Sequence, residues 1–416
     1  MAGKKLEGKK TLSQKQIKDL KGSFGRENFS ELASKLQETL CSLENICLDM
    51  GITGEAGAGK STFINSFRDL HEEDEGAAPT GRGITNTDPT PYPHPKYANV
   101  VLWDLPSIGT PNFQAKNYLE QVHASRYDFF VIIASQLFTS LHAKVANQIQ
   151  KAGKDFYFVR SKVDVDLEAA RLSNPSRFNE ALALQKIREG CVKGFQGKAA
   201  AVAPNVFLIS NSQFSKYDFP LLVEALEKNL QLQKSHSFLL ATPNVSHRIL
   251  ERKKNAMAEH LWLVSVVACG HQAEPIPEIS VACNVDLLVQ IMRGYCISFG
   301  LEESALRKVA EHTDQPLEKL QALVKSPLAT EVTKALVMEL LADATSKGPK
   351  LPKQLVPMAS PGMSFSVVYN VLKTFVDSIV ADAHRILVKV FVSHRASNES
   401  GPSSESGAEI AQVLGS

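Results

Sequence analysis

Short apolar runs alternate with amphipathic stretches through the first half of this chain, after a polar start. Near-continuous apolar runs predict strands at residues 46–53, 100–105, 128–134, 156–160 and 206–209. Between them, apolar residues at helical spacing predict helices, which include residues 60–70, 116–123, 144–152 and 180–194. Apolar strands that alternate with helices are typical of a mostly parallel sheet with helices on both faces. We therefore expect an α/β domain over residues 44–234.

The pattern changes after Lys234, where helical spacing continues but strand signals almost vanish. Helices are predicted at residues 261–268, 284–298, 302–311, 316–324, 329–344 and 365–392. The last of these has a wide apolar face, which predicts packing in a helical core rather than on a membrane. The resulting division is a basic, flexible N-terminus at 1–13, helices at 14–43, the α/β domain, a helical region at 235–395 and a disordered tail at 396–416.

Composition excludes several classes of protein. The 416 residues carry 46 Lys and Arg against 44 Asp and Glu, so the net charge of +2 gives no argument for nucleic-acid binding. Six cysteines without a C-x-x-C pair argue against a zinc site or disulfide framework and fit a reducing cytoplasm. No apolar run approaches the roughly 18 residues of a spanning helix, so we expect a cytoplasmic protein. The lysines from Lys4 to Lys21 form either a solvated tail or a surface for peripheral contact with acidic lipids.

The strongest chemical signal directly follows the first predicted strand. It matches the phosphate-loop pattern G-x-x-x-x-G-K-[ST] at every position, through Gly54, Glu55, Ala56, Gly57, Ala58, Gly59, Lys60 and Ser61. Glycines let backbone N–H groups turn towards a phosphate, Lys60 supplies positive charge for binding and catalysis, and the Ser61 hydroxyl can ligate Mg²⁺. Thr62 opens the next predicted helix and belongs to the same site. The sequence therefore predicts a site for a nucleoside triphosphate and Mg²⁺.

Later motifs, each at the end of a predicted strand, identify the base as guanine. Asp104 ends the second strand, where a carboxylate can hold Mg²⁺ through water. An S-K-x-D element follows the fourth strand, where GTPases use [NT]-K-x-D to read guanine, and consists of Ser161, Lys162 and Asp164. Ser210 and Asn211 follow the last strand, in the place of the last base-contacting loop. A lone S-K-x-D is usually a surface turn, but the order of the motifs favours GTP or GDP over ATP.

With these motifs the chain resembles the immunity-related, interferon-inducible GTPases. The resemblance covers about residues 15–392 and rests on strings at 54–61, 75–81, 91–95, 99–106, 127–130, 156–160 and 216–220, several of them typical of that family. Strings at 295–301 and 326–328 extend it into the helical part. Within the family the strings are most similar to the branch called interferon-inducible GTPase 5. The resemblance implies a Ras-like GTP-binding domain and an all-α helical domain built from both chain ends. It also implies GTP-dependent self-association, association with related GTPases and, for many members, recruitment to intracellular membranes in innate immunity.

Two departures from the family pattern concern the switch residues. Ser107 stands in place of the glycine of the D-x-x-G motif, and its Cβ restricts the backbone. Ile84 stands where the family has a glutamate implicated in hydrolysis, and Asn86 where the usual metal-binding threonine falls. Thr85, or alternatively Thr87 after a shift of one residue, is the remaining candidate for metal binding and catalysis.

Two functions remain open at this point. The first is a slow GTPase whose rate rises on self-association. The second is a catalytically weak nucleotide-binding scaffold or regulator of related GTPases, which both Ser107 and Ile84 favour. Nucleotide affinity is expected in either case, because the phosphate-loop pattern is intact.

An acidic residue, Asp49, interrupts the first predicted strand. Alternation places the apolar residues Ile46, Leu48, Met50 and Ile52 on one face of that strand, with Asp49 on the other. A buried, unpaired carboxylate costs on the order of several kcal/mol. The sequence offers no partner for Asp49, which must be either paired or partly exposed.

Overall fold

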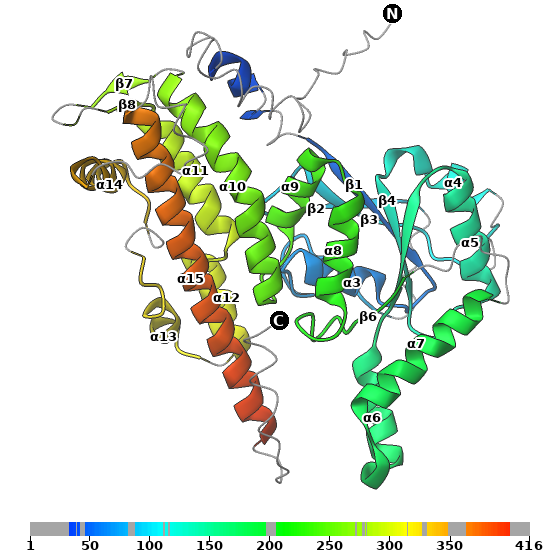
Figure 1. Ribbon diagram of the computed structural model, residues 1–416. Helices are drawn as coiled ribbons and strands as arrows, with labels where there is room; N and C mark the ends of the chain where they lie inside the picture. The colour runs from blue at the N-terminus through cyan, green and yellow to red at the C-terminus, as the bar shows by residue number, and fades with distance from the viewer. Residues whose placement is uncertain are drawn as a thin grey trace, which may run out of the picture. The chain divides into compact units, whose positions relative to one another are not determined.

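The structure, a computed structural model, describes residues 33–38, 40–41, 46–81, 88–110, 113–114, 117–196, 205–270, 273–276, 279, 281–313, 315–326, 331–347 and 363–399. The chain divides into two compact units, Ile46–Ile249 on the one hand and Met1–Asn45 with Leu250–Ser416 on the other. Figure 1 shows the elements of both units. The predicted basic N-terminus and residues 400–416 of the predicted disordered tail lie outside the described residues.

A six-stranded sheet forms the centre of the unit Ile46–Ile249. Its strands are β1 (Leu48–Gly54), β2 (Thr90–Pro93), β3 (Val100–Asp104), β4 (Phe129–Ala134), β5 (Asp155–Arg160) and β6 (Val206–Leu208). Their order is β2-β3-β1-β4-β5-β6, and all neighbours are parallel except β2 and β3. Because parallel strands end at the same edge of a sheet, the loops after β1, β3, β5 and β6 come together there.

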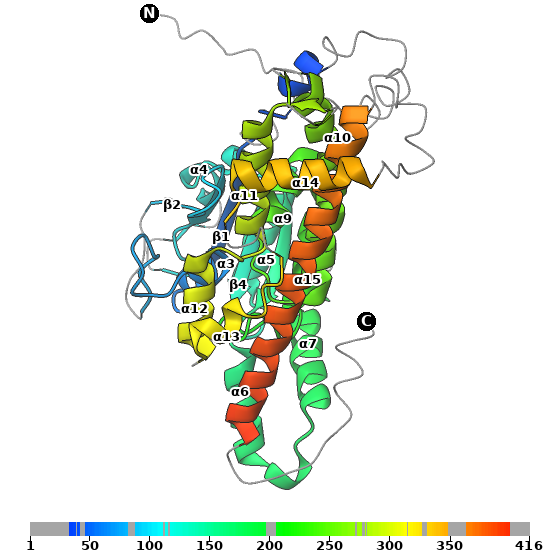
Figure 2. The ribbon, with the colours of Figure 1, turned by 90° about the vertical axis from the view of Figure 1, so that its left-hand side faces the viewer.

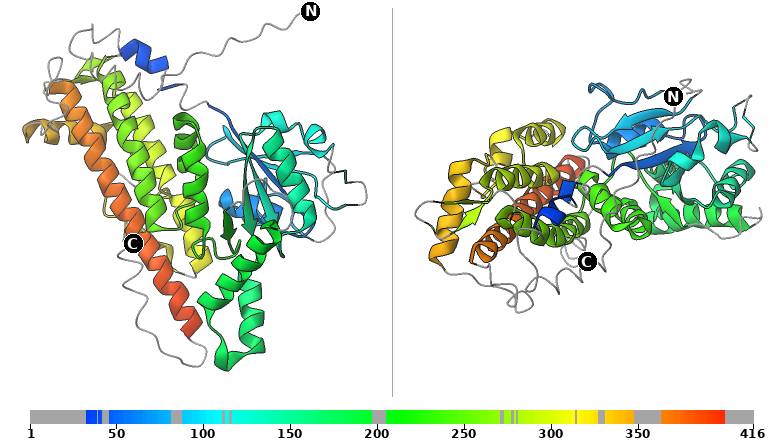
Figure 3. Two further views of the ribbon diagram at one scale, coloured as in Figure 1. Left: turned by 45° about the vertical axis from the view of Figure 1, so that its right-hand side comes forward. Right: turned by 90° about the horizontal axis from the view of Figure 1, so that it is seen from above.

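Helices cover both faces of this sheet (Figures 1 and 3). On one face the rings of Phe67, Phe219 and Phe238 pack together. They come from α3 (Lys60–Phe67), α8 (Phe219–Asn229) and α9 (Leu232–Ala241). The other face carries a core around Phe138 and Phe158, formed with α4 (Tyr118–Gln121), α5 (Ser140–Lys151) and α7 (Glu180–Gln196). The predicted α/β architecture, with a mostly parallel sheet and helices on both faces, is confirmed.

The strand β2 and the helices α6 (Val163–Ser173), α8 and α9 are not among the elements named from the sequence. The strand β2 contains Pro91 and Pro93, which cannot donate to a ladder, and it lies at the edge of the sheet where fewer donors are needed. The helix α6 buries only Val163 and Leu167, so its apolar stripe is too short to give a clear helical period.

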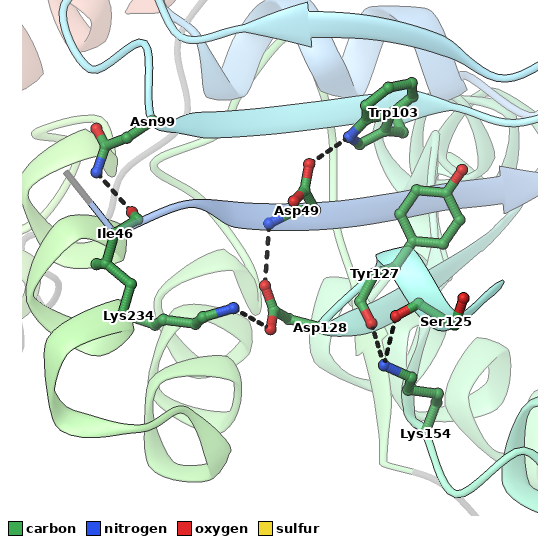
Figure 4. A network of polar contacts seen from close by, with 9 residues as sticks. All are labelled: Ile46, Asp49, Asn99, Trp103, Ser125, Tyr127, Asp128, Lys154 and Lys234. Carbon is green, nitrogen blue, oxygen red and sulfur yellow. Dashed lines mark hydrogen bonds and ion pairs between the residues drawn. The ribbon is translucent and has the colours of Figure 1, made fainter. Parts of the chain in front are cut away.

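A polar network at the start of β1 explains the acidic residue in that strand (Figure 4). Trp103 Nε1 donates a hydrogen bond to Asp49 Oδ1 over 2.7 Å, and the Asp49 N–H donates to Asp128 Oδ2 over 3.0 Å. Lys234, on α9, forms an ion pair with Asp128. The Arg126 guanidinium lies over the Trp103 ring, 4.1 Å from its centroid. Asp49 is therefore hydrogen-bonded, and its network lies at the end of β1 away from the phosphate loop.

Helices make up most of the other unit. They include α10 (His247–Gly270), which crosses the boundary between the units, α11 (Val285–Ser298), α12 (Glu303–Thr313), α13 (Leu317–Gln321), α14 (Lys334–Ser346) and α15 (Met363–Glu399). Figure 2 shows α14 lying across α15, and α14 contacts both α11 and α15. Residues 33–38 and 40–41, which precede β1 in the sequence, are helical. The strands β7 (Glu274–Pro275) and β8 (Ala282–Cys283) form a short ribbon that the sequence pattern does not predict.

The long helix α15 packs into the core of this unit. Its apolar residues are buried along most of the described length, among them Phe365, Val368, Leu372, Phe375 and Ile379. Its fully buried carboxylate, Asp382, accepts hydrogen bonds from the backbone N–H groups of Lys325 and Ser326. The apolar face predicted from the sequence is therefore a core face, and α15 ends at Glu399 rather than at 392.

Candidate functional site

The loop between β1 and α3 has the backbone of a phosphate loop. Gly54, Gly57 and Gly59 have positive φ angles of 151°, 75° and 94°. A Cβ on Gly54 would lie 2.0 Å from a carbonyl oxygen of β4, and one on Gly59 would lie 3.0 Å from the amide nitrogen of Asn211. The helix α3 begins directly after Gly59, so the positive end of its dipole faces the loop. This arrangement suits a phosphate anion.

Side chains from the loops after β5 and β6 bind three consecutive carbonyl groups of this loop. The bonds are Lys162 Nζ to Gly57 O at 2.8 Å, Ser161 Oγ to Ala58 O at 2.6 Å and Asn211 Nδ2 to Gly59 O at 3.0 Å. In a trans peptide the N–H points opposite to the C=O, so these bonds also orient the N–H groups of the same peptide bonds. The Ala58 N–H donates to Glu55 O over 3.2 Å, which leaves the N–H groups of Gly59 and Lys60 as candidates for a phosphate. We call these three bonds the carbonyl clamp.

Lys60 is almost buried and donates to two acceptors. The residue is only 8% exposed. Its Nζ donates to Ser107 Oγ over 2.8 Å and to Glu55 O over 3.4 Å. Burial lowers the pKa of Lys60, and the nearby Asp104 carboxylate partly opposes this. In phosphate loops this lysine reaches the β- and γ-phosphates, so Lys60 can supply charge to the same groups.

Ser61 and Asp104 lie beside each other and fit a magnesium ion. Ser61 Oγ donates to Asp104 Oδ2 over 2.8 Å, while Asp104 Oδ1 is buried and has no hydrogen-bond partner among the described residues. Burial raises the pKa of Asp104, whereas Lys60 and the Ser61 hydrogen bond lower it. The described part of the chain holds no group of three or more His, Cys, Asp or Glu that could bind a metal. A hydroxyl and one carboxylate suffice for Mg²⁺, which usually takes its other ligands from phosphates and water.

Backbone hydrogen bonds connect the segment after β3 to the end of β1 and to the start of the phosphate loop. The Leu105 N–H donates to Ile52 O over 2.9 Å, and the Ile108 N–H donates to Gly54 O over 3.1 Å. A parallel bridge also pairs Ile108 with Glu55. Ser107 lies between these two attachments, which explains why its hydroxyl reaches Lys60.

The hydroxyl of Tyr118, a buried residue of α4, contacts the same segment after β3. This hydroxyl donates to Pro106 O over 2.9 Å, and therefore accepts from Thr53 Oγ1, which is 2.5 Å away. Burial raises the pKa of Tyr118 well above its usual range, so the hydroxyl keeps its proton at neutral pH. Sequence reasoning missed Tyr118, because a tyrosine at helical spacing is usually only a core residue.

The loops that carry the predicted guanine-binding residues meet at this edge of the sheet. Asp164 lies in the first turn of α6, and Asp164 Oδ2 accepts a hydrogen bond from Ser212 Oγ over 3.0 Å. Ser210 Oγ lies 2.9 Å from the same hydroxyl. Lys162 precedes α6 with a φ of 58°, a left-handed conformation that is uncommon outside glycine. Ser212 is a further site residue that the sequence pattern did not single out, since only its place after the last strand points to it.

The remaining predicted residues differ in their surroundings. The carboxylate of Glu55 lies 3.7 Å from Nε2 of His142, a fully buried residue of α5. Ala56, inside the loop, and Thr62, in the first turn of α3, are exposed. The switch residues lie outside the described residues, namely Thr85 with its alternative Thr87, and the departures Ile84 and Asn86.

Comparison with known proteins places these features in one family. A model of the family described as interferon-inducible GTPase (IIGP) matches residues 13–390. Interferon-inducible GTPase 5 of Bos taurus is 37% identical over 385 residues, which are 91% of this chain and 83% of that protein. Interferon-inducible GTPase 1 of Mus musculus is 32% identical over 386 residues, which are 92% of each chain. A solved structure of a probable GTP-binding protein engB is similar over 44% of this chain and 97% of its own, with a TM-score of 0.25 and 15% identity.

Proposed function

This chain belongs to the interferon-inducible GTPase family, and we propose that it binds GTP at residues 54–61 and hydrolyses it to GDP and phosphate with Mg²⁺. The observation that carries the proposal is the carbonyl clamp. It joins the two loops that carry the guanine-reading residue types to the loop that carries the phosphate-binding ones. Because the loops after β5 and β6 are both bonded to the phosphate loop, we expect the three loops to bind the base and the phosphates of one guanine nucleotide together.

The residues of the site divide the work between charge and position. Phosphoryl transfer depends mainly on positioning and on stabilising negative charge. Lys60 supplies positive charge to the β- and γ-phosphates, and the N–H groups of Gly59 and Lys60, oriented by the carbonyl clamp, bind the same anion. Ser61 and Asp104 are the residues that would hold Mg²⁺, which neutralises triphosphate charge when it is bound.

Recognition of the base is assigned to the loops after β5 and β6. Asp164 accepts from the N–H donors of guanine, and the hydrogen bond from Ser212 fixes the orientation of its carboxylate. The aliphatic stem of Lys162 packs on the ring while its ammonium stays on Gly57 O. Ser210 and Asn211 complete the pocket from the loop after β6.

A second candidate function is a nucleotide-binding scaffold or regulator of related GTPases that hydrolyses GTP weakly. The observation that favours it is the hydrogen bond from Lys60 to Ser107, since the lysine needed for transition-state charge is engaged by a side chain of the chain itself. A slow rate is expected in either case. The substitutions Ser107→Gly and Ile84→Glu are the first that should raise it.

Two further properties are proposed from the family resemblance. One is GTP-dependent association with itself or with related GTPases, and the other is an innate-immune role with peripheral contact to intracellular membranes. No helix in the described ranges is long and apolar enough to cross a membrane. Peripheral contact is assigned to the lysines between Lys4 and Lys21, and co-sedimentation with anionic liposomes that is unchanged on deletion of residues 1–21 would contradict it.

Single-turnover hydrolysis of radiolabelled GTP, measured over a range of protein concentrations, tests the main proposal. A rate per molecule that rises with concentration supports a GTPase activated by self-association. Tight binding without phosphate release supports the scaffold. The variant Lys60→Ala should lose both binding and turnover, and failure of the folded wild-type chain to bind either GTP or GDP would overturn both functions.

A further inference from the structure

We propose that the Ser107 hydroxyl competes with the γ-phosphate of GTP for Lys60, and that Ser107 thereby shifts the preference of this site from GTP towards GDP. The inference rests on the proposed nucleotide-binding function. It concerns the position at which this chain has serine instead of the glycine of the D-x-x-G motif.

The contact itself is buried and has a defined polarity. Lys60 Nζ lies 2.8 Å from Ser107 Oγ, and the two residues are 8% and 4% exposed. An ammonium group has no lone pair, so Lys60 is the donor and the hydroxyl is the acceptor. Glycine at this position would have no side-chain oxygen to offer. The interaction therefore exists in this chain because of the departure from the motif.

The number of donors on Lys60 makes the competition selective for the third phosphate. An ammonium has three N–H groups, and within the described residues one is directed to Ser107 Oγ and a second to Glu55 O. The third can serve a β-phosphate oxygen without disturbing Ser107. Contact with both the β- and γ-phosphates requires a further N–H. The D-x-x-G position faces the γ-phosphate in GTPases, so that N–H is the one directed to Ser107 rather than the one directed to Glu55 O.

Burial strengthens the hold of Ser107 on the lysine. Lys60 and Ser107 are both almost buried, so little water competes for the hydrogen bond between them. A hydrogen bond from a charged ammonium group is stronger than one between neutral groups. Loss of this hydrogen bond therefore offsets part of the free energy that Lys60 gains from the γ-phosphate.

Ser107 cannot move aside at little cost, because its neighbours are tied on both sides. Leu105 and Ile108 donate backbone hydrogen bonds to β1, and Pro106 O accepts the Tyr118 hydroxyl. Releasing Lys60 therefore requires either a new rotamer of Ser107 or a shift of the whole segment. GDP, which has no γ-phosphate, requires neither.

The test compares the dissociation constants of GDP and GTPγS in the presence of Mg²⁺ for the full chain and for the variants Ser107→Ala, Ser107→Gly and Ser107→Thr. Ser107→Ala removes only the hydroxyl and should bind GTPγS about tenfold more tightly, the size of one charge-assisted hydrogen bond, with GDP affinity unchanged. Ser107→Gly removes the Cβ as well as the hydroxyl and should change the ratio of the two constants in the same direction by at least as much. Ser107→Thr keeps the hydroxyl and should retain the wild-type ratio.

The control is Ser173→Ala, an exposed serine on α6 that should alter neither constant. Weaker binding of GTPγS by Ser107→Ala would overturn the proposal, because the hydroxyl would then be a ligand of the γ-phosphate. An equal change for both nucleotides, or no change, would overturn it as well. Failure of the proposed function is distinguishable from these results, since the folded wild-type chain would then bind neither nucleotide.

Discussion

The side-chain amide of Asn211 donates a hydrogen bond to the carbonyl of Gly59 over 3.0 Å, which joins the loop after β6 to the phosphate loop. The backbone carbonyl of Asn211 in turn accepts a hydrogen bond from Ser66 Oγ over 3.0 Å. Ser66 belongs to α3, the helix that follows the phosphate loop. Asn211 is therefore fixed on both its side chain and its backbone to the two elements that surround the proposed phosphate site.

Substitution Asn211→Ala should weaken GDP and GTPγS binding to a similar extent, by about fivefold to tenfold. The reason is that Gly59 O loses its side-chain donor and keeps only the Phe63 N–H, so the phosphate loop that both nucleotides share becomes less well ordered. Isothermal titration calorimetry measures the two constants. The control is Asn229→Ala, which removes an amide bonded to the Tyr157 hydroxyl over 2.8 Å in the same unit. Unchanged binding by Asn211→Ala would contradict the positioning role.

Substitution Asp104→Asn should make the stability of the nucleotide-free protein less dependent on pH. Burial raises the pKa of Asp104 above its ordinary 3.8, so the folded chain binds this proton more readily than the unfolded chain. The free energy of unfolding then falls as pH rises from 3.8 through the raised pKa. The asparagine side chain of the variant does not titrate, so the variant does not lose free energy of unfolding in this way. The difference in the free energy of unfolding between the variant and wild type should therefore grow with pH and then level off.

Urea unfolding of both proteins, without nucleotide and Mg²⁺, from about pH 3 to about pH 7 measures this difference. The control Asp155→Asn changes an exposed aspartate at the start of β5 and should leave the pH slope as it is. A constant difference between Asp104→Asn and wild type over the whole range would show that Asp104 does not titrate in this way. In binding assays the same variant should lose most of the gain in GTP affinity that Mg²⁺ gives.

Substitution Tyr118→Phe should loosen the segment that carries Ser107. The variant leaves Pro106 O and Thr53 Oγ1 without their partner and should lower the free energy of unfolding by about 1–2 kcal/mol. Amide hydrogen exchange should become faster in a peptide that covers residues 104–109. The matched control is Tyr157→Phe, which removes a hydroxyl bonded to Asn229 at the far side of the same sheet. Equal exchange in both variants would mean that Tyr118 has only a packing role.

Substitution Trp103→Phe should destabilise the sheet unit by about 2–4 kcal/mol, from lost packing and from the unpaired Asp49 carboxylate. Removal of the carboxylate in the same background, by Asp49→Ala, should then cost less than it does in wild type. A double-mutant cycle on denaturant unfolding measures the coupling. Strict additivity of the two changes would refute the pairing as a source of stability.

The phosphate loop can be predicted from sequence because its chemistry requires consecutive residues, from Gly54 to Ser61. The approach of Asp104, Asp164 and Asn211 to one edge can also be predicted, because each follows a strand of a parallel sheet. The strand β2 and the helix α6 escape prediction because one contains two prolines and the other buries only two residues.

The polar partners of the site require the folded structure. Asp49 meets Trp103, 54 residues away, and Asp128, 79 residues away, only because the registers of β1, β3 and β4 bring them together. The same holds for Lys60 and Ser107, which are 47 residues apart. Sequence reasoning judged Ser107 by the backbone freedom that it lacks, whereas the structure shows a new acceptor for the lysine.

The carbonyl clamp also constrains which substitutions this protein can accept during evolution. The loops that we propose to distinguish guanine from other bases also supply the side chains that bind the carbonyl groups of the phosphate loop. A change at Ser161, Lys162 or Asn211 therefore alters the grip on every nucleotide, so that selectivity and affinity are inherited together. Chimeras between relatives should stay active only when residues 54–61, 161–164 and 210–212 come from the same parent.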